Sequence, residues 1–457
     1  MTNNGFIFII NLLYFSLSQI IFEFDRDFNL NASMTVKEVF TTLAYNDLYT
    51  YINIGTPEKK YKVSISFNDK SLVLLGSEIK RPNIFNESNS ETFKKVSEEI
   101  NLIKNQLFNG YISEDLIKLN NFKEKLKIQF FLGQEIYKDE YSFSDDYEPI
   151  NYSGYLGLAI TGYFNSELPD SLPIYLYNNY KDIYNFNSTF SIIFDHPNNK
   201  SSYKGKLIFS GYPHEYNKSY NIKFYNSSKM QKNENNLDDW CIVSDNSYYG
   251  NNIVDEINKI IFRPEFGIII TSGTYFKYLI EKYFKEYLEQ KICNQSDFDL
   301  IGENYNYIYC NKDIDISKFE SVHFELKEIN FNFTLNYEDL FYEYNGKYYF
   351  LMAAKFYKNQ YFIFGSILMK KYSLVFDKHI SKIGVYNQNI INNYDNNKKS
   401  NKKRIILIIS IVVLSILIII AIIYIIWNYI NRPRVQRKNE IDDNYNYISH
   451  ENNENIN

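Results

Sequence analysis

Cysteine and histidine are scarce in this chain of 457 residues, which has three cysteines and five histidines, and the chain has no excess of positive charge. Lysine and arginine number 49 against 54 aspartates and glutamates, so no nucleic-acid partner is expected. No internal repeat recurs at solenoid or propeller periods, which argues against those architectures. We expect neither a metal site nor a cofactor. The histidines are scattered along the chain, at His196, His214, His323, His379 and His450.

Two of the three cysteines, Cys293 and Cys310, enclose a short loop and are expected to form a disulfide. Metal binding is the alternative, but no histidine or second cysteine pair lies near them in the sequence. Cys241, beside Trp240, is left over, and it is either a buried thiol or a cross-link to a partner. Disulfide formation suits a secreted or lumenal protein.

Two apolar segments set the expected topology. Residues 1–18 are predicted to be a signal peptide, although the lack of Lys or Arg before the apolar run leaves an uncleaved anchor open. Residues 405–427 are long and apolar enough for a transmembrane helix. A polar linker at 387–404 precedes this helix, and a cytoplasmic tail at 428–457 follows it. We therefore expect a single-pass type I membrane protein of the endomembrane system or cell surface, with its N-terminal domain lumenal or extracellular.

Short motifs agree with this topology. Asn-x-Ser/Thr sequons occur only before the predicted transmembrane helix, which is consistent with a glycoprotein. In the tail, Tyr445–Ile448 fits a Tyr-x-x-apolar sorting signal, so contact with a sorting adaptor is expected there. The sequons begin at Asn31, Asn86, Asn151, Asn187, Asn199, Asn217, Asn226, Asn294 and Asn332.

Between the apolar segments, short aromatic and β-branched runs are separated by Asn, Gly and Asp, which is typical of an all-β domain. Only a few helices are expected, for example at Tyr275–Leu288 and Phe93–Ile103. The clearest predicted strands are Tyr61–Ile65, Leu126–Phe131, Phe190–Phe194, Leu207–Ser210 and Tyr372–Phe376.

Four motifs in a fixed order resemble those of the pepsin-like aspartic proteases. They are Ile54–Pro57, Gly154–Ala159, Lys206–Gly211 and Phe362–Asp377. The resemblance covers Asp47–Tyr386 and implies a two-lobed all-β fold, with lobes at 47–205 and 206–386. It implies structural roles for Gly157 and Gly365. It also makes 19–46 a short N-terminal segment, a candidate remnant prosegment.

The acids of that family are missing from the positions where the resemblance places them. Such enzymes hold a water between two carboxylates that share one proton. The first acid position holds Ser66, and the Ser-Gly-Thr that follows Thr271 suggests that Thr271 holds the second. Asp69 could replace the first acid only after a three-residue slip of the strand. An alcohol is far too weak an acid to serve as a general base near neutral pH.

The family's flap tyrosine is also missing, because Ile103 stands at its position. We therefore expect a pseudoprotease, tethered to a membrane, that binds a peptide or protein in the cleft between its lobes. The alternatives are an active aspartic endopeptidase with a divergent site and a type I trafficking receptor. Residues expected to line the cleft are Ser66, Phe67, Ile103, Thr271, Ser272, Gly273 and Thr274.

Overall fold

The computed structural model describes residues 19–26, 29–45, 48–67, 69–79, 83–102, 107–120, 122, 124–137, 152–160, 168–195, 202–216, 223–230, 240–300, 303–355, 361–387 and 424. The predicted signal peptide, transmembrane segment and sorting motif lie outside these residues, apart from Tyr424. Within the described part, no helix is both long and apolar enough to cross a membrane. Residues 1–391 form one compact unit, and residues 392–457 form another.

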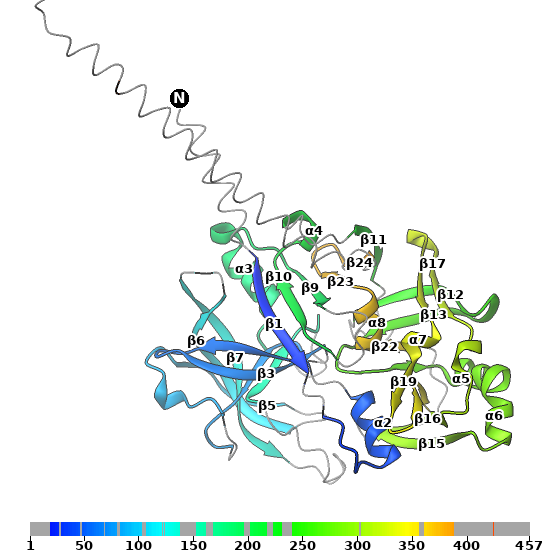
Figure 1. Ribbon diagram of the computed structural model, residues 1–457. Coiled ribbons are helices and arrows are strands. Elements are labelled where there is room, and N and C mark those ends of the chain that lie inside the picture. Colours follow the sequence, from blue (N-terminus) through cyan, green and yellow to red (C-terminus); the bar gives the residue numbers. More distant parts are fainter. Residues whose placement is uncertain are drawn as a thin grey trace, which may run out of the picture. The chain divides into compact units, whose positions relative to one another are not determined.

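Two β-sheets dominate the first unit (Figure 1). The described residues of the first sheet form 13 strands, in which β2 also pairs with β6. Their spatial order is β11 (Lys223–Lys229), β24 (Lys382–Asn387), β23 (Leu374–Asp377), β9 (Thr189–Phe194), β10 (Gly205–Phe209), β1 (Ile20–Arg26), β2 (Leu48–Ile54), β3 (Lys59–Ser66), β8 (Gly154–Gly157), β4 (Leu72–Leu75), β7 (Lys125–Tyr137), β6 (Leu107–Lys118) and β5 (Lys94–Leu102).

The second sheet has 11 strands among the described residues, with β15 (Cys293–Leu300) attached to β16. The predicted disulfide between Cys293 and Cys310 is confirmed and joins β15 to β16. The other strands run in the order β18 (Phe331–Leu335), β17 (Val322–Leu326), β12 (Cys241–Tyr249), β13 (Asn252–Phe262), β22 (Tyr361–Phe364), β14 (Ile269–Thr271), β21 (Met352–Lys355), β16 (Glu303–Asn311), β20 (Lys347–Phe350) and β19 (Phe341–Tyr344).

Helices are few and short, as expected for a mostly β protein. The helix predicted over Tyr275–Leu288 is confirmed as α5 (Gly273–Leu279), a π-helical turn η2 (Ile280–Phe284) and α6 (Lys285–Glu289). The helix predicted over Phe93–Ile103 was wrong, because β5 occupies most of this segment and pairs with β6. The other helices are α2 (Val36–Ala44), α3 (Leu172–Tyr184), α4 (Pro213–Tyr216), α7 (Tyr337–Leu340) and α8 (Ser366–Lys371), with 3₁₀ turns η1 (Glu87–Asn89), η3 (Ile316–Lys318) and η4 (Lys327–Ile329).

The N-terminal segment is part of the core. Strand β1 lies between β10 and β2 and buries alternate side chains, including Phe22 and Phe24. Helix α2 begins with a capping box between Thr35 and Glu38, which satisfies amides of its first turn. The helix then buries Phe40, whose ring stacks on Tyr307 of β16 at 4.0 Å. Residues 20–45 thus contact both sheets.

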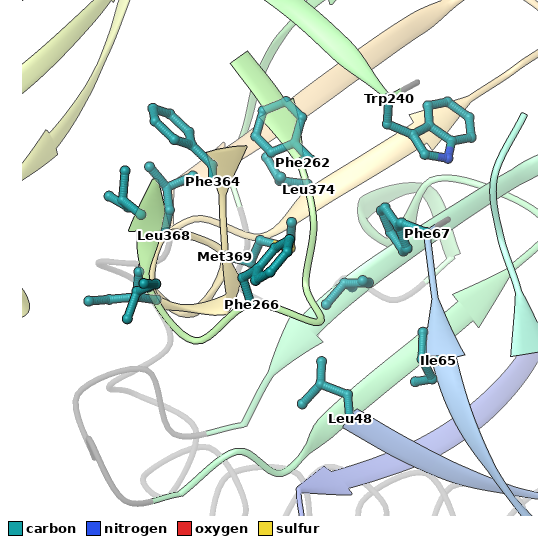
Figure 2. Packing of buried hydrophobic residues seen from close by; sticks show 14 of the residues in the cluster. Leu48, Ile65, Phe67, Trp240, Phe262, Phe266, Phe364, Leu368, Met369 and Leu374 are labelled. Carbon is teal, nitrogen blue, oxygen red and sulfur yellow. The ribbon is translucent and has the colours of Figure 1, made fainter. Parts of the chain in front are cut away.

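A cluster of aromatic rings lies where the sheets meet. The ring centroid of Phe376, in β23, lies 5.2 Å from that of Phe67, the residue directly after β3. It lies 6.0 Å from the ring centroid of Phe262, at the end of β13. Trp240 lies 5.0 Å from Phe376, and its indole N–H donates to the Leu158 carbonyl at 2.8 Å. Figure 2 shows Phe67, Trp240 and Phe262 among the labelled residues of this cluster. The ends of β3 and β13 are therefore anchored to one set of rings.

Candidate functional site

The first turn of the site, Ser66–Ser71, begins at the last residue of strand β3. Ser66 lies opposite Gly157 of the parallel strand β8. The Gly157 amide donates to the Ser71 carbonyl at 3.1 Å, and the Ala159 amide donates to the Asp69 carbonyl at 2.9 Å. A Cβ on Gly157 would stand only 2.4 Å from each of these two carbonyl oxygens. The strand can therefore pass behind the turn only with glycine at this position.

The second turn, Arg263–Ile268, follows strand β13 and repeats this pattern. The Gly365 amide donates to the Ile268 carbonyl at 3.2 Å, and the Ser366 amide donates to the Phe266 carbonyl at 2.6 Å. A Cβ on Gly365 would stand 2.3 Å from both carbonyl oxygens. Phe262 lies opposite Phe364 of the parallel strand β22, and the Arg263 amide donates to the Phe364 carbonyl at 3.0 Å.

These matching contacts identify the counterpart of Ser66 in the second half of the fold. Gly157 faces the carbonyls of residues 69 and 71, which follow Ser66 by three and five positions. Gly365 faces those of residues 266 and 268, which follow Arg263 by three and five positions. Arg263, and not Thr271, therefore stands at the position equivalent to Ser66.

The structure thus corrects the register predicted for Thr271. This residue ends β14, which pairs antiparallel with β22 and parallel with β21, as β4 pairs with β8 and β7. Its pairing with Ala354 matches that of Leu74 with Leu132, so Thr271 is equivalent to Leu74. Its side chain is fully buried, and its hydroxyl donates to the Ser272 carbonyl at 3.0 Å. Thr271 is a core residue of a strand.

The Ser-Gly-Thr that suggested a catalytic turn is the start of helix α5. Ser272 is the N-cap, and its hydroxyl oxygen accepts the Tyr275 amide at 3.1 Å and donates to Asp255 at the same distance. A Cβ on Gly273 would meet only the Lys355 carbonyl at 3.8 Å, and Thr274 is exposed. A helix cap and an aspartic-protease turn use similar small polar residues, which explains the misassignment.

Three charged side chains, Asp69, Arg263 and Glu265, form a charge cluster at the two turns. The Arg263 guanidinium Nη1 lies 3.5 Å from Glu265 Oε1, and both residues are about 7% exposed or less. Burial raises the pKa of Glu265 to about 7, Arg263 opposes this rise, and Asp69 adds to it. Burial also raises the pKa of Asp69. The hydrogen bond with the Ser66 hydroxyl and the charge of Arg263 lower this pKa, but by less. Electrostatic coupling between Asp69 and both second-turn residues therefore links the two turns.

Most of this two-sheet region matches a known family, whereas β1 and α2 precede the matched residues. The family model described as "Eukaryotic aspartyl protease" matches residues 47–388. The chain belongs to this family. No curated protein sequence matches the chain.

Neither Ser66 nor Arg263, which stand at matching positions of the two turns, carries a carboxylate. An aspartyl protease needs two carboxylates close enough to share a proton. Ser66 offers a hydroxyl, and Arg263 offers a guanidinium that is permanently protonated and only donates hydrogen bonds. The carboxylates that are present, on Asp69 and Glu265, stand three and two positions further along their turns.

The remaining residues expected at the aspartyl protease site fall into separate environments. Phe67 is buried in the aromatic cluster, 5.6 Å from Phe190. Ile103 lies outside the described residues, although the β5–β6 hairpin on either side of it is formed, with Leu102 opposite Phe108. Among the described residues, no group of three or more His, Cys, Asp or Glu side chains could hold a metal ion.

Two of the described histidines, His214 and His323, contact hydroxyl groups of other residues. His214 Nδ1 lies 2.9 Å from the Tyr386 hydroxyl, and His323 lies between Ser321 and Thr334. A serine nucleophile needs a hydrogen-bonded base. The Ser66 hydroxyl oxygen accepts the Asp69 amide at 3.2 Å.

Proposed function

We propose that this member of the aspartyl protease family is not a protease, and that it binds a peptide or protein segment between its two lobes. The observation that carries the proposal is the pair of residues at the two acid positions, Ser66 and Arg263. Neither side chain can accept a proton from water near neutral pH. Losing one general acid or base costs about 10²–10⁴-fold in rate, and this chemistry needs both.

The charge cluster supports this proposal. In the family's mechanism one carboxylate must be ionised while the other holds a proton. A permanent positive charge at the second position favours ionised carboxylates around it and would repel a protonated amine leaving group. Arg263 instead forms a buried ion pair with Glu265, an arrangement that fixes the turn.

Binding of an extended chain needs no catalytic carboxylate. Peptides can add to strand edges and hairpins through backbone hydrogen bonds, with side-chain pockets giving specificity. The predicted segment at 405–427 would tether this binding module to a membrane. A trafficking role rests only on Tyr445–Ile448, and an unchanged location of a Tyr445→Ala variant would count against it.

The proposal is tested by a cleavage assay. The purified chain is incubated with denatured protein substrates between pH 3 and 7, with and without the aspartic-protease inhibitor pepstatin. We expect no pepstatin-sensitive cleavage. A variant with Ser66→Asp and Arg263→Asp controls for the scaffold, since gain of cleavage there would show that only the acids are lacking. Reproducible cleavage by the natural chain that pepstatin abolishes would overturn the proposal.

A second candidate function is proteolysis by displaced acids. Asp69 and Glu265 are electrostatically coupled, and the pKa of Glu265 is about 7, which suits a group that exchanges protons near neutral pH. This candidate predicts cleavage that is lost in both Asp69→Asn and Glu265→Gln variants. Binding is measured separately, by fluorescence anisotropy with a panel of labelled extended peptides. The proposed function predicts saturable binding of at least one peptide without its cleavage.

A further inference from the structure

An exposed sequon lies on one edge strand of each sheet. Strand β11 ends the first sheet and carries Asn226, and strand β18 ends the second sheet and carries Asn332. Both asparagines are exposed. Edge strands present unpaired backbone amides and carbonyls, which can pair with other chains and cause aggregation unless they are covered.

The two edges lie at one corner of the molecule. The Tyr225 hydroxyl of β11 donates to the Asn330 carbonyl at 2.8 Å, and its ring lies 4.9 Å from Phe331 of β18. Ser228 donates to Glu328 of η4 at 2.8 Å. Tyr225 itself is 42% exposed. The corner therefore combines two sheet edges with an exposed aromatic ring.

A third exposed sequon lies in the segment before α2. Asn31, Ala32 and Ser33 are all exposed, and the Ser33 amide donates to Asn31 Oδ1 at 3.2 Å. This contact engages only the oxygen of the Asn31 side chain. The amide nitrogen, which would carry a glycan, belongs to an exposed side chain in the segment before α2.

The sequon at Asn187 is more enclosed, because Asn187 is half-buried whereas Asn31, Asn226 and Asn332 are exposed. Asn187 Oδ1 accepts the Thr189 amide at 3.1 Å, the Thr189 hydroxyl and the Gly211 amide at 2.6 Å. Thr189 is 1% exposed and lies in β9, an interior strand of the first sheet. A glycan on the half-buried Asn187 would disturb these three hydrogen bonds and the packing around Thr189, so the fold disfavours modification there.

We propose that Asn31, Asn226 and Asn332 are N-glycosylation sites, that Asn187 is not modified, and that the glycans on Asn226 and Asn332 cover the two sheet edges. The co-reactant is an oligosaccharide activated as a lipid-linked glycosyl pyrophosphate. A bond forms between the asparagine amide nitrogen and the anomeric carbon while the bond from that carbon to the pyrophosphate oxygen breaks. The amide nitrogen loses one proton, and the lipid pyrophosphate leaves.

Site occupancy is the first test. The full chain is expressed in a eukaryotic secretory host and deglycosylated enzymatically in ¹⁸O-water, which labels each formerly modified asparagine as aspartate. Peptide mass spectrometry is expected to find the label at Asn31, Asn226 and Asn332 and to find Asn187 unlabelled. A label at Asn187, or none at both Asn226 and Asn332, overturns the assignment. A wholly unlabelled chain overturns it too, and this outcome is independent of the cleavage assay.

Edge protection is the second test. The double variant Asn226→Gln, Asn332→Gln is compared with Asn31→Gln, the matched control that loses a glycan outside strands β11 and β18. We expect at least a several-fold larger aggregated fraction for the double variant, measured by light scattering after size-exclusion chromatography. Equal aggregation of both variants would refute the protective role. Asn187→Gln should leave the glycan mass unchanged while lowering the melting temperature.

Discussion

Glu265→Gln should change how the stability of the protein depends on pH. Glutamine matches glutamate in size and hydrogen-bonding shape but cannot titrate. In the natural chain burial raises the pKa of Glu265 from its ordinary 4.5 to about 7. Between these values the folded protein holds a proton that the unfolded chain has lost. The folded state therefore binds more protons in this window, and its stability falls as the pH rises from about 4.5 to 7.

The size of this effect follows from the same two pKa values. The difference between the folded and unfolded pKa values of Glu265 corresponds to about 3 kcal/mol of unfolding free energy, at about 1.4 kcal/mol for each pKa unit. Asp69 contributes in the same direction, because its pKa is also raised by burial. Arg263 opposes both shifts, so its presence keeps the loss from being larger.

The assay is urea unfolding of the purified chain at several pH values from 4.5 to 7.5, for the natural protein and the variant. The free energy of unfolding of Glu265→Gln should rise relative to the natural chain by about 3 kcal/mol across this range. Glu281→Gln is the control, because its side chain is 60% exposed on the helix that follows the site. If the natural chain and Glu265→Gln showed parallel pH curves, the buried cluster would not have the electrostatics described.

Three further substitutions test the parts that hold the site. Gly365→Ala should destabilise the protein by about 1–3 kcal/mol or more, because the new Cβ would stand 2.3 Å from two backbone carbonyl oxygens. Gly273→Ala, the control, should change stability by less than about 1 kcal/mol. Equal effects of the two substitutions in thermal unfolding would contradict this reasoning. Phe40→Ala should cost about 3–5 kcal/mol in urea unfolding, and a cost below about 1 kcal/mol would mean that α2 is not part of the core. Removing the disulfide with Cys293→Ser, which opens a loop with a sequence separation of 17, should cost about 3 kcal/mol, and an unchanged melting temperature under oxidising conditions would rule this out.

The first turn could be located from the sequence because a distinctive motif and strict alternation flank Ser66. The second could not, because Arg263-Pro264-Glu265 resembles no catalytic turn and only the backbone contacts of Gly365 identify it. The segment Thr271–Thr274 resembles a catalytic turn more closely than the true second turn does, which is why the sequence alone favours it. A signal was present in hindsight, since Ile260 and Phe262 alternate before Arg263 as Val63 and Ile65 do before Ser66.

The errors in the fold have a similar cause. Val96 and Ile100 in Phe93–Ile103 are spaced as on a helix face, but hairpin pairing with β6 determines the structure of this segment. Conversely, Thr35 and Glu38 of the capping box precede the apolar residues of α2 and could have predicted that helix. The strands at Tyr61–Ile65 and Phe190–Phe194 were predictable because they are rich in aromatic and β-branched residues.

The position of Phe376 has a consequence for how the protein is made. Strands β23 and β24 come last in the described order of the chain, yet β23 pairs with β9 of the first half, which precedes it by almost two hundred residues. The rings beside both turns rest on Phe376. Until the ribosome has released the chain beyond residue 387, β9 lacks a neighbour and the two turns lack their common support. Contacts of such high sequence separation form slowly. The first half of the fold therefore stays incompletely paired and prone to aggregation until β23 and β24 have been synthesised.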